Sequence, residues 1–130
     1  MAYPQTLQSR RILVVEDEYL IASELVWLLN EAGAIIEGPF ASVREAMAAI
    51  DDSDGEIDAA VLDVNLGEGG KSYSVADRLE RLGIPYLFTT GYTRHADNPA
   101  YSDRPRLEKP VRPRALLNAI AALCGGSSGG

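Results

Sequence analysis

Acidic, hydroxyl and amine side chains follow four short apolar runs of this chain, each at the point where a run ends. In chain order these residues are Glu16, Asp17, Asp63, Thr90 and Lys109. Carboxylates, a hydroxyl and an ammonium are groups that can hold a divalent cation and the oxygens of a phosphoryl group. The carboxyl ends of parallel strands meet at one edge of a sheet, where ligands of open α/β sheets bind. The sequence therefore predicts a metal-assisted phosphoryl-transfer site at such an edge.

The carboxylates have separate predicted roles. Asp63 follows four apolar residues and is the predicted phosphoacceptor, because a carboxylate can take a phosphoryl group as an acyl phosphate. Mg²⁺ prefers oxygen ligands, and Mn²⁺ is the alternative ion. The predicted ligands are Glu16, Asp17, Asp63 and the main-chain carbonyl of Asn65.

The amine and the hydroxyl complete the predicted site. Lys109 offers a positive charge to one phosphoryl oxygen, and Thr90 offers a hydroxyl donor to another. Taken singly, each motif has an ordinary explanation: acids favour a helix N-terminus, and threonine favours strands. It is their joint occurrence at successive run ends that indicates a site.

Composition limits the class of protein. With 130 residues, of which 46% are hydrophobic, the chain has the size and composition of one globular domain. A net charge of −7 argues against binding to DNA or to an anionic membrane surface. The single cysteine cannot form an internal disulfide, and no apolar run approaches the roughly 20 residues of a membrane span. We therefore expect a cytoplasmic protein.

Strand-like and helix-like segments alternate between the two ends. Residues 1–9 are interpreted as an N-terminal leader, and residues 125–130 as a flexible Gly/Ser tail, native or added. The predicted strands lie at residues 12–15, 35–36, 59–63, 84–89 and 107–108. The predicted helices include residues 21–32, 42–50, 74–82 and 113–123, whereas residues 92–104 promise at most a short helix.

This alternation predicts an α/β fold. Five strands and about five helices imply a doubly wound parallel sheet covered on both faces. Right-handed crossovers leave few topologies, and the flavodoxin-like order 2-1-3-4-5 is common for this number of strands.

The chain resembles the receiver domains of two-component response regulators over residues 10–124. The resemblance is carried by residues 12–18, by residues 61–66, by Thr90-Gly91 and by Lys109-Pro110, in that order and spacing. It implies a phosphoacceptor at Asp63, metal-site acids at Glu16 and Asp17, a phosphate-sensing hydroxyl at Thr90 and a phosphate contact at Lys109.

The resemblance also implies partners. The phosphoryl donor is a phosphohistidine on a sensor histidine kinase or on a histidine phosphotransfer protein, and a downstream protein can be the target. The chain is expected to be a monomer or weak dimer, and no enzyme beyond self-catalysed phosphotransfer and autodephosphorylation. Residues 85–92 are similar to the Phe-Ala-Thr-Gly motif of single-domain receivers common in alphaproteobacteria, with Thr89 in place of the alanine.

Three further residues are predicted to take part in switching or partner binding. Arg106 stands where many receivers have an aromatic ring that turns inward on activation. Tyr92, close to Thr90, is either a replacement for that ring or a half-buried loop residue. Trp27 lies beside the apolar stripe of the first helix, where it is either packed at the core margin or a partner contact.

Three other functions remain as alternatives. A haloacid-dehalogenase-type phosphatase would need a second aspartate two residues after Asp63, where Asn65 stands. A flavin mononucleotide binder would need a Ser/Thr/Gly-rich phosphate loop after the first strand, where the chain is acidic. A receiver-like scaffold that acts independently of phosphorylation would retain the same residues, so only a phosphorylation experiment separates it from a working receiver.

Overall fold

The protein is described here by a computed structural model, which defines residues 5–91 and 99–125. Its strands are β1 (Arg11–Val15), β2 (Ile35–Phe40), β3 (Ala59–Asp63), β4 (Tyr86–Thr90) and β5 (Arg106–Glu108). They pair in parallel in the order β2-β1-β3-β4-β5, which confirms the predicted flavodoxin-like topology. The carboxyl ends of β1, β3 and β4 therefore lie side by side, with the end of β5 beyond β4.

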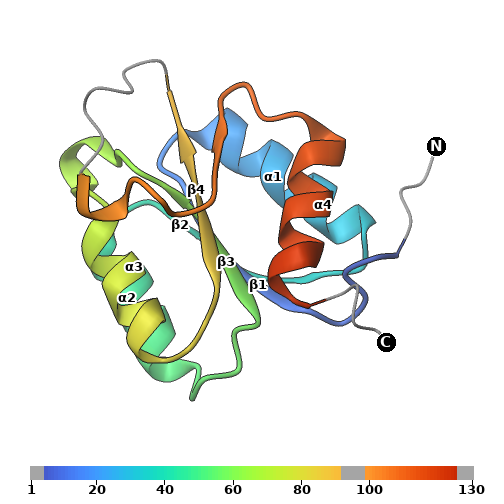
Figure 1. Ribbon diagram of the computed structural model, residues 1–130, viewed down its shortest axis with the longest axis horizontal. Helices are drawn as coiled ribbons and strands as arrows, with labels where there is room; N and C mark the ends of the chain where they lie inside the picture. Colours follow the sequence, from blue (N-terminus) through green and yellow to red (C-terminus); the bar gives the residue numbers. More distant parts are fainter. Residues whose placement is uncertain (1–4, 92–98, 126–130) are drawn as a thin grey trace.

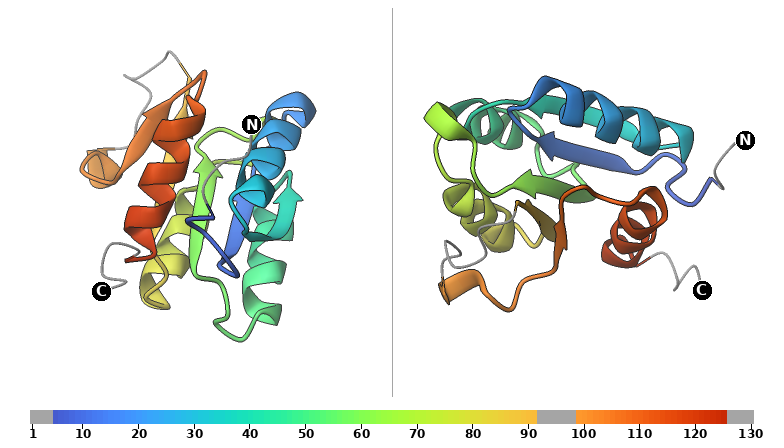
Figure 2. Two further views of the ribbon diagram at one scale, coloured as in Figure 1. Left: turned by 90° about the vertical axis from the view of Figure 1, so that its right-hand side faces the viewer. Right: turned by 90° about the horizontal axis from the view of Figure 1, so that it is seen from above.

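The α-helices of the described residues cover the two faces of the sheet (Figures 1 and 2). They are α1 (Tyr19–Glu31), α2 (Val43–Asp52), α3 (Tyr73–Arg81) and α4 (Pro113–Leu123), and two 3₁₀ turns, η1 (Gly67–Gly69) and η3 (Pro99–Tyr101), lie in the connections. Helices α1 and α4 pack on one face, and α2 and α3 pack on the other, so that each face has its own apolar core. The prediction was about five helices; within the described residues, the β4–β5 connection contributes only η3.

Local sequence explains where the helices begin. Ser42 precedes α2, and its hydroxyl accepts a hydrogen bond from the Glu45 main-chain N–H at 3.2 Å. The Glu45 carboxylate accepts one from the Ala41 N–H at 3.0 Å, one residue before the N-cap, so both side chains satisfy main-chain donors at the start of α2. Pro113 occupies the first turn of α4, where its missing N–H costs no hydrogen bond.

The segment before β1 differs from the prediction. Residues 1–9 were predicted to be a polar leader, but Leu7 is fully buried and belongs to the core beneath α1 and α4. Its main-chain N–H donates to the Ala32 carbonyl at 3.0 Å, and that of Ser9 donates to the Gly33 carbonyl at 3.0 Å. One apolar residue in a polar stretch carries no periodic signal, so its burial could not be read from the pattern.

The strand β2 is longer than predicted, because it continues past Ile36 to Phe40.

Among the helices of residues 5–91 and 99–125, none combines the length and the apolar character needed to cross a membrane.

Candidate functional site

Three predicted site residues meet at the carboxyl edge of the sheet. Glu16 directly follows β1, Asp63 is the last residue of β3, and Lys109 directly follows β5. The Lys109 Nζ lies 3.0 Å from Glu16 Oε1 and 3.2 Å from Asp63 Oδ2. Side chains far apart in the sequence thus form one ion-pair network, as the strand ends predicted.

Strand alternation explains why these carboxylates are buried. Val14 and Val61 belong to the core beneath α1 and α4, so Glu16 and Asp63, two residues further on, point to the same face of the sheet. Their exposed fractions are only 3% and 5%. The second oxygen of Glu16 accepts a hydrogen bond from the Glu18 main-chain N–H at 3.1 Å, which fixes the carboxylate at the start of α1.

The environment changes the proton affinity of two groups. Burial, followed by the negative charge of Glu16, raises the pKa of Asp63 to about 7, although Lys109 acts in the opposite direction. Burial lowers the pKa of Lys109, but its hydrogen bond with Glu16 and the charges of Asp63 and Glu16 outweigh this, so the pKa is raised overall. One ammonium therefore does not fully offset the two buried carboxylates.

A third carboxylate completes an acidic cluster. Oxygen atoms of Glu16, Asp17 and Asp63 all lie within 4.8 Å of one another, and Asp17 is exposed to solvent. Three oxygen donors with one open side suit Mg²⁺, which usually keeps several waters. The crowding of negative charge, seen in the raised pKa of Asp63, is what a divalent cation would relieve. The donor set therefore fits the predicted metal.

Asn65 lies in the loop between β3 and α3. Its side-chain oxygen accepts a hydrogen bond from the Gly67 main-chain N–H at 2.9 Å, and the residue forms an isolated antiparallel bridge with Lys71. Gly67 also approaches the carboxylate cluster, since a Cβ there would lie 3.4 Å from Asp17 Oδ2. The loop is thus ordered next to the cluster, and the Asn65 carbonyl as a ligand stays a prediction.

The predicted hydroxyl, Thr90, ends β4 between the other strand ends. It is 5% exposed, and its Oγ1 has no hydrogen-bond partner within the described ranges. Its carbonyl accepts from the Lys109 main-chain N–H at 2.8 Å, which couples the two residues. A buried hydroxyl without a partner is suited to donate to a group that arrives, such as a phosphoryl oxygen.

The structure adds one residue that the sequence did not assign to the site. Thr89 is fully buried, and its Oγ1 likewise has no hydrogen-bond partner among the described residues. It pairs in register with Asp63. Counting alternate positions along the two strands could have identified it, provided that their register was known.

The predicted switch residues have different environments. Arg106 lies on β5 and donates from Nη2 to the Tyr101 carbonyl at 2.8 Å, so it holds η3 rather than filling an aromatic site. Trp27 is 54% exposed and is not among the residues of either core, and its role as a partner contact stays a prediction. Tyr92 lies outside the described residues.

A second polar cluster holds the end of the β4–β5 connection. Arg104 Nε lies 2.6 Å from Glu80 Oε2, and Arg104 Nη2 lies 3.2 Å from Glu80 Oε1. The Tyr86 hydroxyl also donates to Glu80, and burial with this hydrogen bond raises the pKa of Tyr86 to about 12. The Tyr101 ring stacks on Tyr73 with centroids 5.0 Å apart. These contacts hold η3 and the residues after it against α3 and β4.

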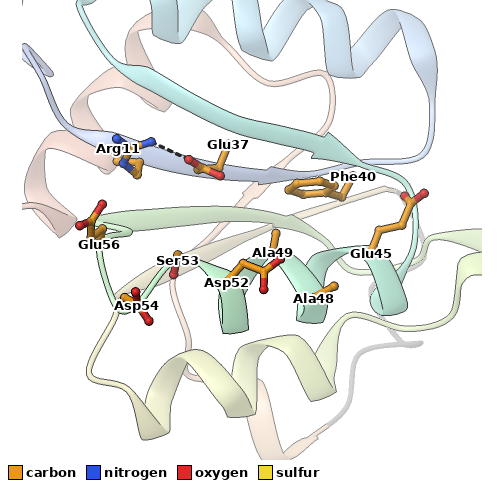
Figure 3. Close-up of a pocket in the computed structure, with 10 residues that line it drawn as sticks. All are labelled: Arg11, Glu37, Phe40, Glu45, Ala48, Ala49, Asp52, Ser53, Asp54 and Glu56. Atoms are coloured by element: carbon orange, nitrogen blue, oxygen red, sulfur yellow. Dashed lines mark hydrogen bonds and ion pairs between the residues drawn. The ribbon is translucent and has the colours of Figure 1, made fainter.

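A hollow of about 620 Å³ lies elsewhere, between β2 and α2 (Figure 3). Its polar lining consists mainly of carboxylates, and its one guanidinium, that of Arg11, lies 2.6 Å from Glu37. Neither Asp63 nor Lys109 lines it. The volume of a cavity therefore does not locate the phosphoryl chemistry in this fold.

The chain matches no protein-family model and no curated protein sequence, but it matches solved structures over most of its length. SdrG from Sphingomonas melonis Fr1, a receiver domain, is 40% identical, with a TM-score of 0.77 over 88% of this chain and 96% of SdrG. The BeF3-activated conformation of SdrG from Pseudomonas melonis Fr1 is 37% identical, with a TM-score of 0.72 over 93% of this chain and 98% of that chain.

A response regulator receiver protein from Sinorhizobium medicae WSM419 shares the fold at 23% identity, with a TM-score of 0.79 over 92% of this chain and 97% of that protein. The identity to SdrG over nearly its whole length shows more than a common fold. This chain belongs to the response regulator receiver domains of two-component signalling.

Proposed function

We propose that the chain accepts a phosphoryl group on Asp63 from a phosphohistidine of a sensor histidine kinase or a histidine phosphotransfer protein. The observation that carries this proposal is the convergence of Lys109 on two buried carboxylates, 3.0 Å from Glu16 and 3.2 Å from Asp63. Asp17 adds the third carboxylate of a cluster whose donors fit Mg²⁺.

The transfer is a displacement at phosphorus. An Asp63 oxygen forms the new P–O bond while the P–N bond to the donor histidine breaks, and its electron pair returns to the imidazole. Lys109 offsets negative charge on the phosphoryl oxygens, and the Thr90 hydroxyl donates to one of them. Held by Glu16, Asp17 and Asp63, Mg²⁺ would supply the remaining positive charge. Beyond this self-catalysed transfer and its own dephosphorylation, we assign the chain no enzymatic activity.

The output follows from the hydroxyl and the amine. A phosphoryl group on Asp63 gives Thr90 and Lys109 strong acceptors that they lack in the free protein. Thr90 ends β4 and Lys109 directly follows β5. We therefore infer that the arrangement of η3 and β5 shifts and changes the protein-binding face that they form. The signal then passes to a downstream protein, or the phosphoryl group is relayed or drained.

A surface beside the site suits the phosphoryl donor. An apolar hollow of about 280 Å³ lies between α1 and the residues after β5, and Ile21, Lys109 and Pro110 are among its lining residues. Leu20 and Trp27 are exposed on α1, with exposed fractions of 76% and 54%. We propose that a kinase or phosphotransfer protein docks here, in the cytoplasm.

The test is phosphorylation by acetyl phosphate with Mg²⁺, measured by intact mass. The wild type should gain about 80 Da, the mass of one phosphoryl group. Asp63→Asn should gain nothing, and Asp52→Asn, an exposed surface control, should behave like the wild type.

A cognate kinase provides the second arm of the same test. If the wild type gained no mass with either donor, the phosphorylation-independent scaffold would be the better description. The phosphatase alternative has less support, because Asn65 is engaged in the turn to Gly67 and carries no carboxylate for acid–base work.

A further inference from the structure

The site contains a second buried hydroxyl that the proposed chemistry does not use. Thr89 is 0% exposed, and its Oγ1 has no hydrogen-bond partner within residues 5–91 and 99–125. Nearly all buried side-chain polar atoms in proteins have a partner, so an exception requires an explanation. For Thr90, the neighbouring residue, the proposed phosphoryl group is the explanation. For Thr89, the explanation comes from its position in the sheet.

Strand alternation places Thr89 on the face of the sheet that carries Asp63. Val61 and Leu87 are register partners on β3 and β4, and both lie in the core beneath α1 and α4. Two residues further along each strand are Asp63 and Thr89, which are again register partners. Side chains two apart on a strand share a face, so the carboxyl and the hydroxyl are cross-strand neighbours.

Lys109 passes over the same position. Strand β4 lies between β5 and β3, so a side chain that follows β5 must cross β4 to reach Asp63 at 3.2 Å. Thr89 pairs with Leu107 on β5 as well as with Asp63 on β3. Its side chain is therefore the one that β4 presents on the face of this ion pair.

We propose that the Thr89 hydroxyl donates a hydrogen bond to Asp63 while the acyl phosphate is hydrolysed, and thereby shortens the life of the phosphorylated state. This inference rests on the proposed phosphoacceptor role of Asp63. Rotation about the Cα–Cβ bond moves Oγ1 among its staggered positions, so the hydroxyl can turn toward the oxygen on which charge develops.

The direction of the effect follows from the charges. In hydrolysis, the oxygen of water bonds to phosphorus while the P–O bond to Asp63 breaks, and the bonding pair returns to the Asp63 oxygen. The products are inorganic phosphate, the free carboxylate and a proton released to solvent. Because negative charge grows on Asp63 in the transition state, a donor beside it lowers the barrier.

The experiment compares Thr89→Val, which keeps the shape and removes the hydroxyl, with Thr89→Ser, which keeps the hydroxyl. Each protein is phosphorylated with acetyl phosphate and Mg²⁺, freed of the donor, and followed by intact mass. We expect the phosphorylated form of Thr89→Val to decay about 3- to 10-fold more slowly, which corresponds to about 0.7–1.4 kcal/mol in the barrier. Thr89→Ser should decay at close to the wild-type rate.

Thermal unfolding of the metal-free proteins provides the folding control. Thr89→Val should unfold at the wild-type temperature or above it, because it replaces a buried hydroxyl without a partner by a methyl group. A phosphorylated Thr89→Val that decays at the wild-type rate or faster would overturn the inference alone, as would a Thr89→Ser protein that decays as slowly as Thr89→Val. A wild type that gains no phosphoryl group would overturn the proposed function as well.

Discussion

The Lys109 ammonium lies 3.2 Å from Asp63 Oδ2, although Lys109 follows β5 and Asp63 ends β3, two strands that do not pair with each other. The same ammonium lies 3.0 Å from Glu16, so one cation serves two buried carboxylates. The exposed Asp17 adds a third negative charge within the cluster. The site therefore has more negative than positive charge, which suits it to a divalent cation and then to a phosphoryl group.

Removing the amine should destabilise the metal-free fold. Lys109→Met would leave Glu16 and Asp63 buried without their cation, and we expect the free energy of unfolding to fall by about 2–4 kcal/mol. Urea denaturation at neutral pH with EDTA measures this loss. Lys71→Met changes an exposed lysine on the adjacent loop and should shift the value by less than about 0.5 kcal/mol. Equal effects of the two substitutions would contradict the buried network.

Asp63→Asn should stabilise the metal-free protein at alkaline pH. The pKa of Asp63 is raised in the folded state, to about 7 from 3.8, by burial and by Glu16. The folded protein therefore holds this proton more tightly than the unfolded chain does, and its stability falls as the pH rises between these values. We expect Asp63→Asn to gain about 1–3 kcal/mol near pH 8 and almost nothing near pH 4.

Urea titrations across this pH range measure the difference. Asp52→Asn, exposed on α2, serves as the control and should show no comparable rise of stability with pH. A difference between Asp63→Asn and the wild type that did not grow from pH 4 to pH 8 would argue against a destabilising buried charge at this position.

Mg²⁺ should stabilise the fold through the carboxylate cluster. At a free concentration tenfold above its dissociation constant, a ligand of the folded state adds about 1.4 kcal/mol, and thermal unfolding measures the rise. Asp17→Asn should abolish this gain but change the metal-free stability little, since Asp17 is exposed. Glu18→Gln alters the next acid along the chain, also exposed, and should keep the response; loss of the response in both variants would point to a diffuse charge effect.

The contacts of Arg104 with Glu80 should protect the amides at the end of the β4–β5 connection from hydrogen exchange. Arg104 contacts both oxygens of Glu80, which lies on α3. Helix α3 packs on the face of the sheet opposite to α4. Arg104→Met removes these contacts, so the amides of residues 99–106 should exchange hydrogen faster, as measured by mass spectrometry. Arg114→Met, exposed on α4, is the control. Unchanged protection in Arg104→Met would mean that the aromatic stack and the Arg106 hydrogen bond are enough to hold η3.

The sequence was sufficient to predict the strand order and to place Glu16, Asp63 and Lys109 at one edge of the sheet. Apolar runs of four or five residues alternate with helical stripes, and right-handed crossovers then leave few strand orders, which is why the order 2-1-3-4-5 could be predicted. The site followed from the same reasoning, since Glu16, Asp63 and Lys109 stand directly at the ends of predicted strands. The apolar runs, the helical stripes and the residues at the strand ends are all local patterns, and local patterns can be read directly from a sequence.

Only the tertiary structure decided how side chains far apart in the chain face one another. The burial of Leu7 depends on the space left between α1 and α4, and the contact of Arg106 with the Tyr101 carbonyl depends on how the β4–β5 connection folds back. The position of Thr89 beside Asp63 depends on the register of β3 and β4. A shift of one residue in that register would send the hydroxyl to the opposite face, and no local pattern fixes it.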